Sequence, residues 1–190
     1  MEGQTLTVDG VHFVNIQNGI MGGGAGGQGD RAQQRVRAQR EFAPSIARTA
    51  STRGRSRCCM WNIRGSSRTK QGHHVKSRAL RTEVIDSDIE DGPDGTASYL
   101  IDVPNGGATI VRGCTLEKGP KNENHTAAIS IGAEGVTHPT DEIVIENNRF
   151  RNDGAPTIFV NNLTATEARL KGNKLSGPVR AALQGDGTAD

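Results

Sequence analysis

A short phrase recurs five times along this chain of 190 residues. It consists of an apolar residue, a variable residue, a Gly, Asn or Asp, two more variable residues, and then Leu, Ile or Phe. The five copies begin at Val8, Val84, Val111, Ile145 and Leu170. The last four begin 27, 34 and 25 residues apart. A repeat of this length, built from short strands and turns, predicts a solenoid in which each repeat contacts only its neighbours.

Each copy of the phrase has the pattern of a strand that runs into a turn. We expect its first apolar residue to point inward. The Gly, Asn or Asp two positions later should adopt a positive φ, which these residues tolerate best. The final Leu, Ile or Phe then returns to the interior. A second short strand with inward and outward alternation is expected between copies, at 75–77, 101–103, 129–131 and 158–160.

One such coil cannot bury its own apolar face. Neighbouring coils must stack about 4.8 Å above and below it and complete its backbone hydrogen bonds. Stacking gives parallel sheets with ladders of like residues inside, and the aromatic content of 3% fits a narrow core of Val, Ile and Leu. The sequence shows neither the long 3.6-residue apolar period of helical repeats nor the dense Leu pattern of leucine-rich repeats.

Two segments resemble coils of the right-handed parallel β-helix repeat proteins, the pectate-lyase-like superfamily. They are EIVIENNRFRNDG (142–154) and EARLKGNKLSG (167–177). The resemblance extends over roughly 73–177 and an isolated coil at 4–20. It implies an all-β fold, a short right-handed parallel β-helix with a disordered Arg-rich insertion. The resemblance says little about activity, because lyases, hydrolases, epimerases and non-catalytic binding proteins share this scaffold.

We predict four regions along the chain. An isolated N-terminal β-helix coil occupies 1–21, a Gly- and Arg-rich segment 22–69, consecutive coils 70–177, and a tail or cap 178–190. Solenoids need capped ends, and the chain begins in mid-coil without a cap. We therefore expect a fragment of a longer β-helix that can associate with itself through its uncapped ends.

The segment before the coils is strongly basic. Residues 31–82 hold 12 Arg, 2 Lys and one acid, whereas the rest of the chain has a net charge of −11. One interpretation is a frame disruption within 28–66, because the 76 residues from Val8 to Val84 contain no further coil phrase. A second is a disordered insertion that buries too little apolar surface to offset its ordering entropy. A third is an arm that binds a polyanion, although nucleic acid is not the expected partner.

Targeting and cysteine signals are sparse. The start of the chain lacks the basic and apolar regions of a signal peptide, although such a signal could have been lost with a missing N-terminal part. No apolar run is long enough to span a membrane. Cys58, Cys59 and Cys114 form no recognisable disulfide or zinc pattern. We expect Cys114 to be a packing residue and assign no metal ligands.

A polar strip at the start of the coils is the candidate site. If Val75 aligns with Ile101, Lys76 lies beside Asp102 on the next coil. Polysaccharide lyases on the similar scaffold use a basic side chain to remove the proton α to a uronate carboxylate. The resemblance therefore implies an acidic polysaccharide as partner, with Lys76, Arg78, His74 and Asp102 as candidate catalytic residues. The alternative is that these side chains form the solvated face of a strand and contribute little to stability.

Candidate substrate-binding residues are His73, Lys70, Glu123 and His125. The last two lie in a polar loop, 117–126. We expect the length of this loop to explain the interval of 34 residues between the third and fourth copies of the phrase. The loop either shapes a groove or is an ordinary surface loop. Calcium is the one possible cofactor, because carboxylates cluster at Asp86, Asp88, Glu90, Asp91 and Asp94. The same stretch is also an ordinary turn sequence.

Two classes of function remain open. The first is a carbohydrate-active β-helix protein that acts on or binds an acidic polysaccharide in the manner of a lyase. The second is a non-catalytic glycan-binding or structural β-helix, or an inactive fragment. Nucleophile-elbow, zinc-protease and P-loop motifs are missing from the sequence. A lyase predicts a perturbed pKa at Lys76, Arg78 or His74 beside Asp102, whereas a binding module predicts an exposed polar strip.

Overall fold

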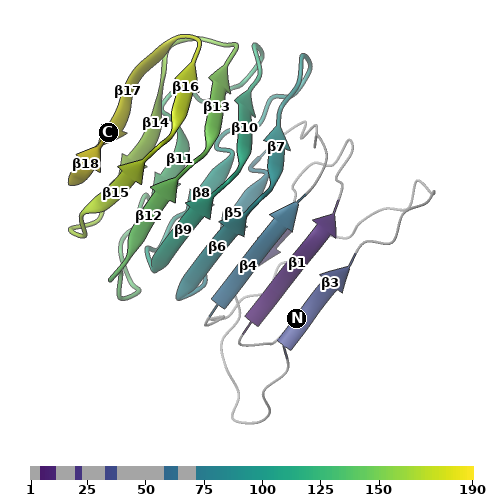
Figure 1. Ribbon diagram of the computed structural model, residues 1–190, viewed down its shortest axis with the longest axis vertical. Helices are drawn as coiled ribbons and strands as arrows, with labels where there is room; N and C mark the ends of the chain where they lie inside the picture. The colour runs from purple at the N-terminus through teal and green to yellow at the C-terminus, as the bar shows by residue number, and fades with distance from the viewer. Residues whose placement is uncertain (1–4, 12–19, 23–32, 38–57, 64–71) are drawn as a thin grey trace.

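The computed structural model describes residues 5–11, 20–22, 33–37, 58–63 and 72–190, with side chains described for 72–190. Every regular element in these residues is a β-strand, and every strand pairs in parallel with its neighbours. The strands form three sheets (Figure 1). The prediction of an all-β parallel solenoid is therefore confirmed.

The first sheet has eight strands. In spatial order they are β18 (Gly187–Ala189), β15 (Ala168–Lys171), β12 (Ile143–Glu146), β9 (Ala108–Arg112), β6 (Arg81–Ile85), β4 (Cys58–Ile63), β1 (Thr5–Val11) and β3 (Gln33–Arg37).

The second and third sheets are smaller. The second contains β16 (Lys174–Ser176), β13 (Arg149–Asn152), β10 (Thr115–Lys118) and β7 (Asp88–Glu90) in that order. The third contains β17 (Val179–Gln184), β14 (Thr157–Asn162), β11 (Ala127–Ile131), β8 (Ile101–Val103), β5 (Val75–Ser77) and β2 (Ile20–Gly22).

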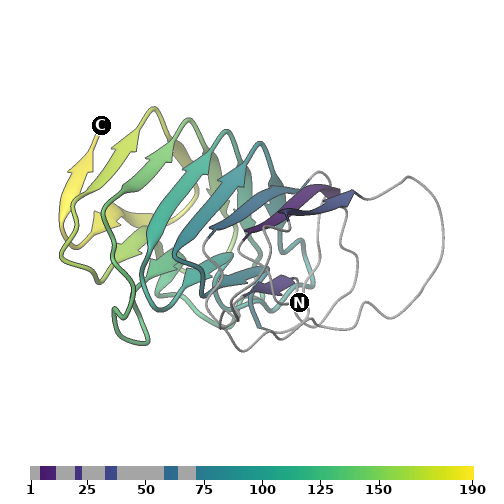
Figure 2. The ribbon, with the colours of Figure 1, turned by 90° about the horizontal axis from the view of Figure 1, so that it is seen from below.

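From β6 onward the chain visits the first, second and third sheets in turn. It does so four times, so that each coil adds one rung to each sheet (Figure 2). This path follows from the sequence pattern, because a coil of three short strands leaves its backbone groups and its apolar face open until the next coil covers them. All three sheets face a shared apolar interior.

The repeat phrase occupies one column of the first sheet. Its opening residues lie in register on β6, β9, β12 and β15, namely Val84, Val111, Ile145 and Leu170. Its closing residues form a ladder on the second sheet, namely Ile89, Leu116, Phe150 and Leu175. A third ladder on the third sheet contains Val75, Ile101, Ile129 and Val160. These columns form most of the core.

The turn within each phrase has the backbone that the pattern requires. The residue two positions after each opening residue has a φ of 45° at Asp86, 68° at Gly113, 56° at Asn147 and 63° at Gly172. Four successive coils thus stack a left-handed residue at the corner between the first and second sheets. The preference of Asp, Asn and Gly for this conformation explains the third position of the phrase.

Strands also occur outside 70–177. In the segment 22–69 the structure describes β3 and β4, and β4 places Trp61 between Val84 and Val8 in the first sheet. The N-terminal β1 is thus continuous with this sheet through β4. Most of the Arg-rich segment lies outside the described residues, so its three interpretations stay predictions. The segment 178–190 contributes β17 and β18, which add a further rung.

The C-terminal end of the core is only partly covered. Leu175, Val179, Ala182 and Leu183 pack against the core but are half-buried. Self-association through the ends of the solenoid stays a prediction. Within the described residues, no helix is long and apolar enough to cross a membrane.

Candidate functional site

A row of polar side chains follows the outer face of the third sheet. Ile101, Ile129 and Val160 point into the core. Because alternate strand residues point to opposite faces, the residue after each of them points away from the core. These residues are Asp102, Ser130 and Asn161, and Lys76 on β5 extends the row in register. We call these four residues the outer row.

Lys76 lies between two carboxylates. Its Nζ is 2.8 Å from Asp102 Oδ2 and 2.7 Å from Glu134 Oε1. The predicted juxtaposition of Lys76 and Asp102 is confirmed. The expectation that solvent screens this pair is wrong, because the Asp102 side chain is only 3% exposed. Removal of Lys76 would leave the Asp102 carboxylate with little access to water.

Glu134 was not recognised in the sequence. It lies in the connection from β11 to β12 (132–142), which has eleven residues against five between β14 and β15 (163–167). Loop 117–126 therefore does not account alone for the interval of 34 residues, as we expected. Attention to the Gly-Ala-Glu-Gly sequence after β11 would have indicated a turn with one acidic residue.

Arg78 completes the contacts of Glu134. Its Nη2 donates to Glu134 Oε2, and its Nη1 donates to Asn105 Oδ1. Each carboxylate oxygen of Glu134 thus contacts a different cation, Lys76 on one side and Arg78 on the other. The hydrogen bonds from these cations lower the pKa of Glu134. We call Lys76, Arg78 and the residues that bind them, Asp102, Asn105 and Glu134, the cation fork.

His73 lies beside the cation fork. Its ring stacks on Tyr99, with ring centroids 5.4 Å apart and an interplanar angle of 9°. Its Nδ1 accepts a hydrogen bond from the Tyr99 backbone N at 3.2 Å, and its Nε2 lies 3.6 Å from Asp102 Oδ2. Burial lowers the pKa of His73, against the opposing effect of Asp102. The ring is therefore neutral near pH 7, with its Nδ1 lone pair occupied and the proton on Nε2.

The structure places His74 away from the other candidate catalytic residues. Its side chain is buried, and its Nε2 lies 2.6 Å from Asp91 Oδ1. His74 comes directly before inward-facing Val75, and Leu100 comes directly before inward-facing Ile101 on the next rung. Leu100 is in the core as well. Two successive residues thus turn inward at this corner, which a simple strand alternation does not anticipate.

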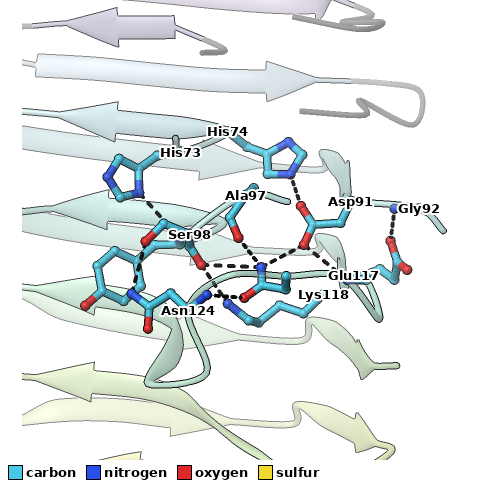
Figure 3. A network of polar contacts seen from close by, with 12 residues as sticks. His73, His74, Asp91, Gly92, Ala97, Ser98, Glu117, Lys118 and Asn124 are labelled. Atoms are coloured by element: carbon cyan, nitrogen blue, oxygen red, sulfur yellow. Dashed lines mark hydrogen bonds and ion pairs between the residues drawn. The ribbon is translucent and has the colours of Figure 1, made fainter. Parts of the chain in front are cut away.

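His74 belongs to a buried network at the corner between the second and third sheets (Figure 3). Asp91 Oδ2 accepts from Gly119 N at 3.1 Å and from Asn122 Nδ2 at 2.9 Å. Lys118 Nζ donates to the carbonyls of Ser98 at 2.7 Å and Ala127 at 3.0 Å. Because Lys118, Asp91 and Asn122 are all buried, these groups close the corner of the solenoid.

Burial has a large effect on the cation of this network. It lowers the pKa of Lys118 to about 8, partly offset by the charge of Asp91. The neighbouring Glu117 has a raised pKa because it is buried, although Gly92 N donates to its Oε2 at 2.7 Å. This network was not predicted, because a lysine at the end of a strand is usually exposed to solvent.

The remaining candidate residues do not join the cation fork. Lys70 lies outside the described residues. Glu123 and His125 are exposed, and the His125 carbonyl accepts a hydrogen bond at 3.2 Å from Arg180 on β17. In the third sheet β17 and β5 are separated by β14, β11 and β8. His125 precedes β11 and is contacted from the β17 side of the sheet, whereas Lys76 lies on the other side of β11.

The carboxylates of the acidic stretch proposed for calcium bind different partners. Asp91 binds His74 and Asn122, whereas Asp94 Oδ1 accepts from Lys121 Nζ at 2.7 Å. Among residues 72–190, no group of three or more His, Cys, Asp or Glu side chains is arranged to hold a metal ion. Calcium binding stays an untested prediction.

Cys114 is a packing residue, as predicted. It is buried in the core, and its Sγ donates to the carbonyls of Val84 at 3.4 Å and Arg112 at 3.3 Å. Burial raises the pKa of its thiol to about 12. The thiolate, which is the nucleophilic form, is thus not populated near neutral pH.

The outer row contains polar atoms without hydrogen-bond partners. Asp102 Oδ1, Ser130 Oγ and Asn161 Oδ1 are buried and unpaired, and Thr157 Oγ1 is the only other such atom among the described side chains. Each unpaired buried group costs about 1–3 kcal/mol. Three of these four atoms belong to the outer row.

Comparison with protein-family models, with curated proteins and with solved structures finds no match to this chain. The class of protein is therefore given by the structure itself: a parallel β-solenoid with a cation fork on its third sheet.

Proposed function

We propose that this protein is a glycan-binding β-helix that uses its cation fork to hold the carboxylates of an acidic polysaccharide without cleaving it. One observation supports this proposal above the others. Lys76 and Arg78 already hold a carboxylate, that of Glu134, with one oxygen on each cation. Charge-assisted hydrogen bonds of this kind are stronger than those between neutral groups. The planar guanidinium of Arg matches the geometry of a carboxylate.

The surroundings of the cation fork suit a sugar. The stacked rings of His73 and Tyr99 lie beside Asp102. Such rings have an apolar face on which a sugar ring can pack and polar edges that can form hydrogen bonds. The third sheet repeats every 4.8 Å or so along the solenoid, which suits a polymer with a regular repeat of its own.

The protonation states favour binding over lyase chemistry. Removal of a proton needs a base that is free to accept it. Burial acts to lower the pKa of Lys76, but hydrogen bonds to Asp102 and Glu134 outweigh it, and the pKa is raised. An arginine side chain, such as that of Arg78, is a hydrogen-bond donor and not a base. His73 already uses its Nδ1 lone pair. Among Lys76, Arg78 and His73, the basic side chains at this site, the base that a lyase needs is thus occupied or protonated.

We also propose that the solenoid winds to the right and is related to the pectate-lyase-like β-helices. The support is the coil phrases at 142–154 and 167–177 together with the general right-handedness of parallel crossover connections.

The test is calorimetric titration of the full chain with polygalacturonate and with the same polymer after methyl esterification. We expect binding to the free acid and its loss on esterification. Arg78→Ala should weaken binding because it removes one of the two cations of the cation fork. The side chain is 39% exposed, so we expect the variant to stay folded. The matched control is Arg112→Ala, which removes an exposed arginine paired with Glu146 at 3.4 Å on the first sheet.

Two outcomes would contradict the proposal. Equal affinity for the free and esterified polymers would show that carboxylates are not recognised. Appearance of an ultraviolet-absorbing unsaturated product, with or without calcium, would show that the chain is a lyase rather than a binding module.

A further inference from the structure

Glu134 reaches the cation fork from a separate part of the solenoid. It follows β11, whereas Lys76 is on β5 and Arg78 lies directly after it. In the third sheet β8 separates these two strands. The Glu134 side chain therefore spans one whole rung to place its carboxylate on Lys76 and Arg78.

The turn that carries Glu134 is built on two glycines. Gly132 has a φ of 86° and Gly135 a φ of 94°. The turn rests on the neighbouring coil through backbone hydrogen bonds from Gly132 N to Val103 O and from Glu134 N to Pro104 O, both 2.9 Å. Residues 133–137 are all exposed.

The backbone and the side chain of Glu134 are thus held by different partners. The backbone hydrogen bonds of the turn involve Val103, Pro104 and Asn105, not the two cations. The Glu134 side chain is 45% exposed. Rotation of this side chain toward solvent would break its two ion pairs and leave the backbone hydrogen bonds and the core unchanged.

We propose that Glu134 is an internal competitor of the ligand, whose carboxylate occupies the cation fork until a uronate carboxylate displaces it. This inference rests on the proposed function. The exchange replaces one carboxylate with another, so Lys76 and Arg78 stay paired before and after binding. A neutral glycan has no group that can take the place of Glu134, and the competition therefore selects for acidic polymers.

The test compares Glu134→Gln with the parent chain in titrations with polygalacturonate. The glutamine amide keeps the shape of the Glu134 side chain but carries no charge. We expect the variant to bind about 3- to 10-fold more tightly, the gain when exposed ion pairs to two cations no longer compete. Glu134→Ala should show the same direction of change.

The control is Glu142→Gln. Glu142 lies in the same connection, is similarly exposed at 37%, and pairs with Arg81 at 2.9 Å instead of with the cation fork. It changes the net charge by the same amount, and we expect its affinity to equal that of the parent. Equal gains for Glu134→Gln and Glu142→Gln would overturn the inference, because they would reflect net charge alone.

The outcomes separate the inference from the proposed function. If the parent binds the free acid and Glu134→Gln binds equally or more weakly, the inference is overturned while the proposed function stands. If neither the parent nor either Glu134 variant binds any uronic-acid polymer, both are overturned.

Discussion

Lys76 and Asp102 lie side by side on adjacent rungs of the third sheet, with Nζ 2.8 Å from Oδ2 and with Asp102 almost wholly buried. This pair combines two properties that usually occur apart. It faces away from the core, as a surface pair does, yet its carboxylate has almost no contact with water. The energetic role of Lys76 is therefore that of a partner in a buried ion pair.

Substitution of Lys76 by Met should destabilise the protein. It leaves the Asp102 carboxylate buried, with His73 as the remaining basic group at 3.6 Å. We expect the free energy of unfolding to fall by about 3–5 kcal/mol, measured by urea denaturation. The control is Lys121→Met. Lys121 pairs with Asp94 at 2.7 Å, but its side chain is 62% exposed, so the loss should stay below about 1 kcal/mol. Equal losses for the two variants would contradict this interpretation of the burial.

The stability of the protein should rise in alkaline solution because of Lys118. Its pKa is about 8 in the folded state and about 10.4 in an unfolded chain. Between these values the unfolded state binds more protons, so the free energy of unfolding increases with pH, by up to about 3 kcal/mol. Below about pH 8 the buried lysine is charged in both states and this gain is absent.

Denaturation of the parent and of Lys118→Met between pH 7.5 and about 10.4 provides the measurement. We expect the difference in stability between the two proteins to change steadily over this range. A difference that stays constant with pH would show that Lys118 is protonated with an ordinary pKa.

Glycine substitutions at two turns should have unequal costs. Gly113 and Gly177 have similar positive φ values of 68° and 81°. A Cβ at Gly113 would lie 2.3 Å from the Oδ1 of Asp86, the mobile end of an exposed side chain. A Cβ at Gly177 would lie 2.0 Å from the backbone oxygen of Asn152, which cannot move aside.

We expect Gly113→Ala to cost about 1–2 kcal/mol, the usual cost of a left-handed backbone for a residue with a Cβ. Gly177→Ala should cost clearly more, because the backbone must also shift. Urea denaturation of both variants measures the loss in the free energy of unfolding. A smaller loss for Gly177→Ala than for Gly113→Ala would refute the steric argument.

Substitution of His74 separates structural from functional roles. His74→Leu removes the partner of Asp91 Oδ1 inside the buried network, and we expect a loss of about 1–3 kcal/mol in stability. The affinity for polygalacturonate should not change at a temperature where the variant is folded, because the ring does not contact the cation fork. If His74→Leu changed the affinity as much as Arg78→Ala, His74 would be part of the proposed binding site, and this prediction would be wrong.

The repeat phrase was enough to predict the rungs of the solenoid. Its apolar positions fixed the columns at Val84 and Ile89, and its third position fixed the left-handed turn at Asp86. These features depend on residue type at short spacing, and each coil repeats them. The register of Lys76 with Asp102 followed directly from the alignment of Val75 with Ile101.

The contacts of Glu134 and Lys118 could not be predicted in the same way. Both depend on connections between strands, which differ from coil to coil and carry no repeated pattern. Glu134 contacts residues 56 and 58 positions earlier, across an intervening rung. Lys118 lies on the same face of β10 as inward-facing Leu116, as strand alternation requires. A buried lysine is nevertheless rare, and its partners, the carbonyls of Ser98 and Ala127, lie on other elements of the chain.

The connections from the third sheet to the first all lie on one corner of the solenoid, stacked above one another. Gly106 pairs with His138 in this stack, and Thr166 donates to the carbonyl of Thr140. A long connection such as 132–142 can therefore reach the cation fork while the core columns stay in place. On the proposed function, this corner is the place at which a change of sequence alters the ligand that is bound while the rungs stay the same.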